Sequence, residues 1–262
     1  CEWEGVGCDA YGRVIELDFS DLDLTGRIPS EIHYLFKLET LDLSGNGITG
    51  SIPTHVYDLR NLKKLYLYQN ELTGTISTLI GNLDSLEYLH LSRNSLSGSI
   101  PEELRSYSNS VLSPLKYLNL YDNQLTGTLP NNLNLGNLWY FDIGRNFIRG
   151  SIPADIGSDY GKLKYLHIDH NRLTSSIPDS IPLMANGRMI SLLANNNQLS
   201  GAVPDNWIMF NKLVQFNIHE NYFDYLGPNN CKMNVFSGGN CVEFKADCNI
   251  CSCDDNFCAA MC

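Results

Sequence analysis

The sequence predicts a right-handed repeat solenoid of the α/β type, with short strands stacked into one long parallel sheet on its concave side. Two observations predict it: one unit recurs nine times between residues 14 and 230, and the cysteines are confined to the two ends of the chain. A unit this short cannot bury its own apolar face, so stacking must supply the stability. The copies follow each other at intervals of 24, 24, 24, 29, 23, 25, 26 and 24 residues and begin at Val14, Leu38, Leu62, Leu86, Leu115, Leu138, Leu163, Met189 and Leu213.

The fixed positions of the unit each have a physical reason. Apolar residues at positions one, four and six, such as Leu38, Leu41 and Leu43, predict a short strand with one buried face. Position nine is Asn in eight copies, where the amide can donate to and accept from the backbone of neighbouring units, and only Leu22 breaks this column. Position thirteen is Gly in seven copies, which predicts an unusual backbone dihedral. Position sixteen is Pro in eight copies, which ends the extended stretch and fixes the return path.

The consensus L-x-x-L-x-L-x-x-N-x-L-(T/S)-G-x-I-P resembles that of plant-type, extracellular leucine-rich repeats. The start, Cys1-Glu-Trp-Glu-Gly-Val-Gly-Cys8, resembles the N-terminal cap motif C-x-W-x-G-V-x-C of that family. The resemblance implies a disulfide between Cys1 and Cys8, with Trp3 packed over the open end of the core. It also implies a secreted or cell-surface setting.

The cysteine-rich tail departs from the plant pattern. Seven cysteines stand where plant caps usually carry one pair, and the spacing looks more like the tail of leucine-rich-repeat proteins from diatoms and related algae. Thiolates at this spacing could also hold zinc, and the connectivity of disulfides is not readable from spacing. Beside a disulfide-type N-terminal cap we expect disulfides in an oxidising compartment, with one of the seven tail cysteines left over. The candidate cysteines are Cys1, Cys8, Cys231, Cys241, Cys248, Cys251, Cys253, Cys258 and Cys262.

The expected organisation is an N-terminal cysteine cap at residues 1–13, nine leucine-rich repeats at 14–230 and a cysteine-rich C-terminal cap at 231–262. The net charge of −11 argues against nucleic acid or an anionic membrane as a partner, because both need a basic surface. No apolar run reaches the length that a membrane span needs. The chain begins at Cys1 without a signal peptide, as expected of a processed product.

A candidate binding surface follows from the residues between the buried leucines, which face the concave side. Position three holds four consecutive tyrosines, with His, Asp and Arg beside them at positions five, seven and eight. Aromatic side chains with a polar tip are favoured at interfaces, because they bring a large contact area at low entropic cost. The candidate ligand-binding residues are Tyr66, Tyr68, Tyr88, His90, Arg93, Tyr117, Tyr121, Tyr140, Asp142, Arg145, Tyr165, His167 and Asp169.

Other interpretations of these columns stay open. Neighbouring tyrosines also stabilise a sheet simply by packing on one another. The first repeats are acidic on this face, which would suit a basic peptide or a divalent cation, or only a solvated surface, through Glu16, Asp18, Asp21, Glu39 and Asp42. A metal site is not expected, since no ligand motif accompanies the neighbouring residues Asp142, His167, Asp169 and His170.

The leading hypothesis is a non-catalytic extracellular module that binds a protein, a peptide or a cell-wall polysaccharide on the concave face of the third through seventh repeats. An enzyme is not expected, because the sequence has no nucleophile elbow, no phosphate loop and no supported Ser/His/Asp arrangement, and no cofactor is implied. A structural matrix or appendage protein, assembled through its edges and a spare cysteine, is the alternative. Ice binding is a third interpretation, based on Thr and Ser at positions twelve and fourteen, although Arg27, Arg149 and Ala202 interrupt that array.

Overall fold

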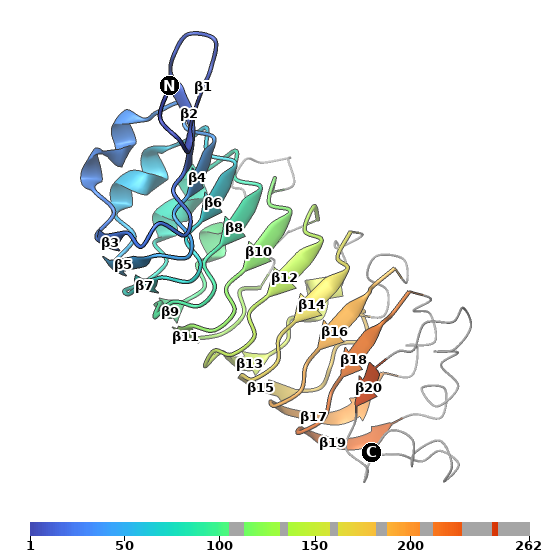
Figure 1. Ribbon diagram of the computed structural model, residues 1–262. Helices are drawn as coiled ribbons and strands as arrows, with labels where there is room; N and C mark the ends of the chain where they lie inside the picture. Colours follow the sequence, from blue (N-terminus) through green and yellow to red (C-terminus); the bar gives the residue numbers. More distant parts are fainter. Residues whose placement is uncertain are drawn as a thin grey trace.

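The protein forms an elongated stack of strands, with Val6–Cys8 at one end of its main sheet and Glu243–Lys245 at the other (Figure 1). The computed structural model describes residues 1–104, 113–131, 136–157, 162–181, 188–204, 212–226 and 243–245. The seven cysteines from Cys231 to Cys262, which the sequence predicts to form disulfides, lie outside the described residues. No helix among the described residues is long and apolar enough to span a membrane.

One sheet of eleven strands runs the length of the stack in the order β1-β2-β4-β6-β8-β10-β12-β14-β16-β18-β20. All nine strands expected from the repeat are present, and they pair in parallel with equal repeat positions opposite each other, as Tyr117 lies opposite both Tyr88 and Tyr140. The strands are β1 (Val6–Cys8), β2 (Val14–Asp18), β4 (Thr40–Asp42), β6 (Lys64–Tyr66), β8 (Tyr88–His90), β10 (Tyr117–Asn119), β12 (Tyr140–Asp142), β14 (Tyr165–His167), β16 (Ser191–Leu193), β18 (Gln215–Asn217) and β20 (Glu243–Lys245).

A second row of parallel strands follows, formed by positions ten to fifteen of the repeats (Figure 1). The row consists of three small sheets, and bridges between Thr75 and Ser97 and between Thr128 and Arg149 link them to one another. The sequence analysis did not predict this row, because Gly recurs in it and Gly is depleted in strands. Its strands are β3 (Thr25–Gly26), β5 (Gly47–Gly50), β7 (Glu71–Leu72), β9 (Ser97–Ser99), β11 (Gln124–Thr126), β13 (Arg149–Ser151), β15 (Arg172–Ser175), β17 (Gln198–Val203) and β19 (Tyr222–Leu226).

Short 3-10 helices form part of the return path between repeats. Pro29 and Pro53, at position sixteen, are the N-caps of η1 and η2, as the fixed φ of proline favours at a helix start. The third copy has Ser77 at this position, and its side chain accepts the Leu79 N–H instead. These helices are η1 (Ser30–Tyr34), η2 (Thr54–Asp58), η3 (Thr78–Asn82), η4 (Glu102–Leu104) and η5 (Ala154–Gly157).

The core is a continuous stack of apolar columns between the strands and the return segments. At position four, Leu41, Leu65, Leu89 and Leu118 are each fully buried. Each side chain packs on its equivalent in the next repeat, so burial is shared along the whole stack and no repeat closes a core alone. The core therefore holds the main sheet in register and leaves the intervening side chains on the concave face.

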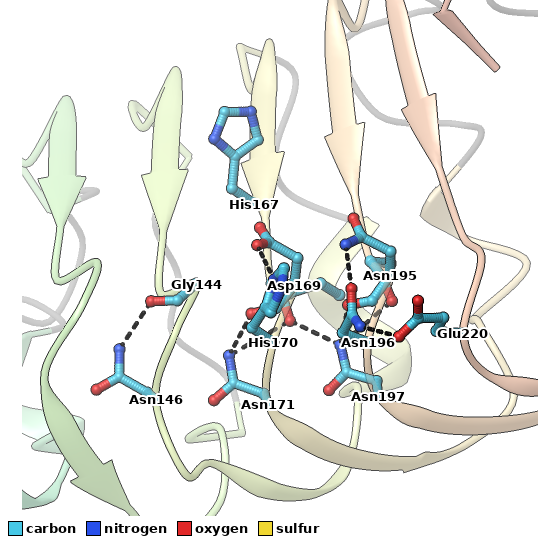
Figure 2. Close-up of polar contacts among 12 residues, drawn as sticks. Gly144, Asn146, His167, Asp169, His170, Asn171, Asn195, Asn196, Asn197 and Glu220 are labelled. Carbon is cyan, nitrogen blue, oxygen red and sulfur yellow. Dashed lines mark hydrogen bonds and ion pairs between the residues drawn. The ribbon is translucent and has the colours of Figure 1, made fainter. Parts of the chain in front are cut away.

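The asparagine column forms the hydrogen-bonded ladder that the sequence predicts (Figure 2). In Asn146, Nδ2 donates to the carbonyls of Leu120, Ile143 and Gly144 at 3.0, 3.1 and 3.1 Å, and Oδ1 accepts the Leu125 N–H at 2.9 Å. One amide therefore satisfies two carbonyls of its own turn and two groups of the preceding repeat. The same pattern recurs at Asn70, Asn94, Asn123, Asn171, Asn197 and Asn221.

Two turn positions adopt left-handed backbone: position eight in all nine repeats and position thirteen in eight of them. The seven glycines at position thirteen have φ between 76 and 94°, as predicted, and Ser175 takes this place with φ 67°. Position eight was not predicted to be special, because it holds Asp, Gly, Gln, Arg, His, Asn and Glu. Its nine residues nevertheless have φ between 49 and 66°, including Arg93, Arg145 and His170. These three side chains therefore leave the chain from a tight turn at the edge of the concave face.

The N-terminal end is closed differently from the way the resemblance implied. The disulfide between Cys1 and Cys8 is present. The expectation for Trp3 was wrong, since its side chain is 81% exposed. The open edge is covered instead by β1, which pairs antiparallel with β2 and satisfies its main-chain groups, while Phe19 packs against the core.

At the other end, β20 pairs in parallel with β18, so the main sheet receives a further strand from the segment expected to form the C-terminal cap. Phe244 takes the register position opposite Phe216. The boundary between the repeats and this cap, at residues 230 and 231, stays a prediction.

Candidate ligand-binding site

A row of aromatic rings crosses the middle of the concave face. The rings of Tyr117 and Tyr140 are stacked with centroids 4.5 Å apart, and Tyr88 and Tyr165 extend the row at 6.3 and 5.6 Å. Parallel register places these position-three residues opposite each other, so the predicted column is a contiguous surface.

His90 joins this row to the tyrosines of the third repeat. Its ring stacks on Tyr68 at 4.1 Å and meets Tyr117 edge-on at 5.6 Å, while its Nε2 lies 2.8 Å from Ser92 Oγ. Burial lowers the pKa of His90 from 6.5 to about 4. The imidazole is therefore neutral at pH 7 and adds an uncharged aromatic ring to the surface.

Trp139 belongs to the same cluster, although the sequence analysis did not select it. Its ring lies 5.7 Å from Tyr117, 5.8 Å from Tyr140 and 6.1 Å from Tyr165. It stands at position two, where neighbouring repeats carry charged residues that pair as Lys63–Glu39 and Lys116–Glu87, each at 2.6 Å. A single aromatic residue in a column of Glu, Lys and aliphatic residues was the signal that could have found it.

Two open hollows lie side by side on this face and share Tyr68 and His90. The first has a volume of about 330 Å³ and is lined by Asp42, Tyr66, Tyr68, Tyr88, His90, Tyr117 and Trp139. The second has a volume of about 360 Å³ and is more polar, with Tyr68, Gln69, His90, Ser92, Arg93, Asn119, Tyr121, Tyr140 and Asp142 around it. Together the two hollows are lined by nine of the predicted residues: Tyr66, Tyr68, Tyr88, His90, Arg93, Tyr117, Tyr121, Tyr140 and Asp142.

Asp142 is largely buried beneath this surface. Its Oδ2 accepts the Tyr140 hydroxyl at 3.1 Å, and its Oδ1 accepts the Gly144 N–H at 2.9 Å. Burial, followed by the charge of Asp142, raises the pKa of Tyr140 above its ordinary value, so this phenol stays protonated. Asp142 therefore orients Tyr140 and fixes the turn, and it is only 6% exposed itself.

The structure aligns Asp142, His167 and Ser191, an arrangement that the sequence analysis did not find. His167 Nδ1 lies 3.4 Å from Asp142 Oδ2, and His167 Nε2 lies 2.9 Å from Ser191 Oγ. Ser191 is only 2% exposed, and its single hydroxyl proton is directed at Gln215 Oε1 at 3.1 Å. The arrangement resembles a catalytic triad, but a buried serine oriented in this way is a poor nucleophile. Asp142 and His167 are neighbours in the position-five column, as the sequence analysis noted, but Ser191 was missed because it stands at position three of the next repeat.

Arg145 and Asp169, which line neither hollow, stand in the segments that follow β12 and β14. His170 Nδ1 and Asp169 Oδ2 are 2.8 Å apart (Figure 2), and the Arg145 guanidinium lies 5.9 Å from the centre of the Tyr121 ring. Within the described residues, no group of three His, Cys, Asp or Glu side chains is arranged to hold a metal ion.

Comparison with family models identifies the repeats. The leucine-rich-repeat models match residues 36–96, 114–135 and 162–184. A sequence comparison with curated proteins gives no match. The leucine-rich-repeat ectodomain of the Arabidopsis thaliana membrane receptor kinase GASSHO1/SCHENGEN3, solved in complex with CASPARIAN STRIP INTEGRITY FACTOR 2, is 33% identical with a TM-score of 0.76, covering 82% of this chain and 25% of that one.

The chain is a leucine-rich-repeat solenoid of the plant type. It is also similar to a plant ice-binding protein, at 26% identity and a TM-score of 0.71, covering 91% of this solenoid and 84% of that chain. The ectodomain of the Arabidopsis receptor kinase HAESA, in complex with an N-terminal extended IDA peptide hormone ligand, is 25% identical with a TM-score of 0.54. The match covers 97% of this chain and 48% of that chain. The solenoid spans only a quarter of the GASSHO1 chain and about half of the HAESA chain.

Proposed function

We propose that this leucine-rich-repeat protein is an extracellular, non-catalytic recognition module that binds a protein, peptide or polysaccharide ligand on its concave face. The observation that carries the proposal is the aromatic row across β8, β10, β12 and β14, which borders two adjoining hollows. Similarity to receptor ectodomains solved with ligands supports it.

The geometry suits an extended ligand. The hollows are shallow and lie side by side along consecutive parallel strands, so a chain-like molecule would contact several repeats at once. Partly buried aromatic rings that are already stacked on their neighbours lose little conformational entropy when a ligand binds to them. A small molecule would use only part of this surface.

Binding of the folded protein to arrays of extracellular peptides and polysaccharides tests the proposal. The double variant Tyr117→Ala/Tyr140→Ala should lose the array signal, because it removes the centre of the row. Tyr222→Ala is the matched control, since this tyrosine is 69% exposed on β19 in the second row. An array signal that survives the double variant would exclude the concave site.

Ice binding is a second candidate, supported by the second row of strands. Exposed or partly exposed Thr and Ser recur there at one-strand spacing, which is about 4.8 Å in a parallel sheet: Thr49, Ser51, Thr73, Thr75, Ser97, Ser99, Thr126 and Thr128. The similarity to a plant ice-binding protein over most of both chains adds weight. If this row binds ice, the wild type will shape growing ice crystals, Thr75→Tyr will abolish the effect, and Tyr117→Ala will keep it.

The structural matrix alternative stays a prediction, because the spare cysteine on which it depends lies outside the described residues. Disulfide-linked oligomers on non-reducing gels are its expected sign. A monomer without a free thiol would count against it.

A further inference from the structure

The first hollow is an aromatic depression with one carboxylate, situated where the acidic first repeats meet the tyrosine row. We propose that this hollow, the cation pocket, binds the positively charged side chain of an arginine or lysine in a peptide ligand. The inference rests on the proposed function and names the chemistry of its ligand. The pocket is lined by Asp42, Tyr66, Tyr68, Tyr88, His90, Tyr117 and Trp139.

Six of the seven lining residues present aromatic rings. The face of such a ring carries negative electrostatic potential, which attracts guanidinium and ammonium groups. The rings are held by one another: Tyr68 stacks on His90 at 4.1 Å, and Trp139 meets Tyr117 at 5.7 Å with a tilt of 56°. Rings tilted against each other form walls in more than one direction, as a pocket for a cation requires.

Asp42 supplies the opposite charge at one side of the pocket. Its hydrogen bonds from the N–H and hydroxyl of Ser44, at 2.9 and 2.5 Å, both end on Oδ1, so Oδ2 can accept from a ligand. The pKa of Tyr66 is raised, first by burial and then by the neighbouring Tyr88 and the charge of Asp42. The Asp42 charge thus acts on the pocket walls, and a ligand cation would experience the same field.

Few positive charges oppose a cation here. His90 is neutral at pH 7, as its lowered pKa shows, and Lys63 is paired with Glu39 at 2.6 Å. Lys64, exposed on β6 two residues before Tyr66, and Arg93, which lines the adjoining hollow, are the repulsive groups. An anionic ligand is disfavoured by Asp42, by Asp142 beneath the neighbouring hollow and by the net charge of −11.

A peptide is favoured over a free small cation because the pocket is open toward a second, polar hollow. That hollow offers Arg93, Asn119 and Tyr121, whose side chains can bond a peptide main chain. A basic side chain in the first hollow would therefore leave its own backbone beside suitable partners. A small organic cation would use the first hollow alone.

The test compares two pentapeptides by calorimetry: Gly-Gly-Arg-Gly-Gly and the same peptide with citrulline, which keeps the shape of arginine without its charge. The arginine peptide should bind about ten-fold more tightly. Tetramethylammonium, as the small-cation arm, should bind more weakly than the arginine peptide. Equal binding of the two peptides, no binding of the arginine peptide at millimolar concentration, or tighter binding of tetramethylammonium would each overturn the proposal.

Variants locate the effect. Asp42→Asn should abolish the preference for arginine, and Lys64→Gln should strengthen it. Asp18→Asn is a matched control, because Asp18 makes the same local bonds to Ser20, at 3.2 and 2.7 Å, but does not line the pocket. An equal effect of Asp18→Asn and Asp42→Asn would contradict the pocket.

The array experiment separates this inference from the proposed function. A ligand that needs Tyr117 and Tyr140 but contains no basic residue would leave the recognition surface in place and exclude the cation pocket. Array binding that is unchanged in the Tyr117→Ala/Tyr140→Ala variant would exclude both the recognition surface and the cation pocket.

Discussion

The concave face and the second row of strands are built from the same nine repeats, yet side chains differ from repeat to repeat on the concave face and stay nearly constant in the second row. Position three on the concave face changes from Glu, Thr and Lys through four tyrosines to Ser and Gln, whereas position twelve in the second row is Thr or Ser in seven of nine copies. Both rows are parallel strands held by main-chain hydrogen bonds, so neither composition is required by the backbone.

The difference teaches what each surface can recognise. A row of unlike groups with hollows between them can discriminate one ligand from another. A repeating row of small hydroxyl groups can match only something that repeats at the same spacing. The buried Leu and Asn columns are common to both rows, so substitutions can separate stability from recognition.

Asn146→Ala should have the largest effect, and it should damage both surfaces together. The substitution removes four hydrogen bonds and leaves the buried Leu125 N–H without its acceptor, while the three carbonyls keep one other donor each. We expect a cost of about 2–4 kcal/mol in the free energy of unfolding. Denaturant unfolding measures it. Asn61→Ala is the control, because this exposed side chain makes one bond, to the Phe36 carbonyl, and should cost less than about 1 kcal/mol.

Tyr117→Ala should separate the two surfaces. It removes the ring that contacts Tyr88, His90, Trp139 and Tyr140, and we expect ligand affinity to fall about 30- to 100-fold, as for a central aromatic anchor. Titration with any ligand found on the array measures the loss. Unchanged affinity with intact folding would place recognition elsewhere.

A pH titration of stability should report the burial of His90. Its pKa is about 4 when folded against 6.5 unfolded, so the unfolded state binds more protons between these values. The contribution of neutral His90 to the free energy of unfolding should therefore be fully present above pH 6.5. It should be lost as the pH drops toward 4, which lowers the free energy of unfolding by about 1–2 kcal/mol after allowance for solvent screening. The slope should be smaller in His90→Gln. An identical slope in the variant would exclude this assignment.

Thr126→Lys should have the smallest effect. The side chain is exposed in the second row, so we expect a change within about 0.5 kcal/mol in the free energy of unfolding and no change in concave binding. Thermal denaturation and the same ligand titration check it. Loss of concave binding in this variant would break the comparison between the two rows.

The parts of the structure that the sequence predicted depend on contacts within a repeat or with the next one. Leu41 and Asn146 recur at fixed spacing because each packs or bonds against its own equivalents, so spacing alone places them. The left-handed turn at position eight was missed because chemically unlike residues occupy it. Trp139 has no aromatic equivalent at position two, and Ser191 stands in a different column from Asp142 and His167, so only the side-chain geometry shows which neighbours they contact. The prediction that Trp3 packs over the core was wrong because a matching motif does not fix the direction in which a side chain points.

Photo-crosslinking tests the central claim most directly. Benzoylphenylalanine is placed at Tyr121, beside the concave hollows, or at Thr126, in the second row, and each protein is irradiated in the extracellular fraction of its source. The account predicts a crosslinked product from position 121 that excess wild-type protein removes, and none from position 126. Products from position 126 alone, or equally from both, would contradict recognition by the concave face.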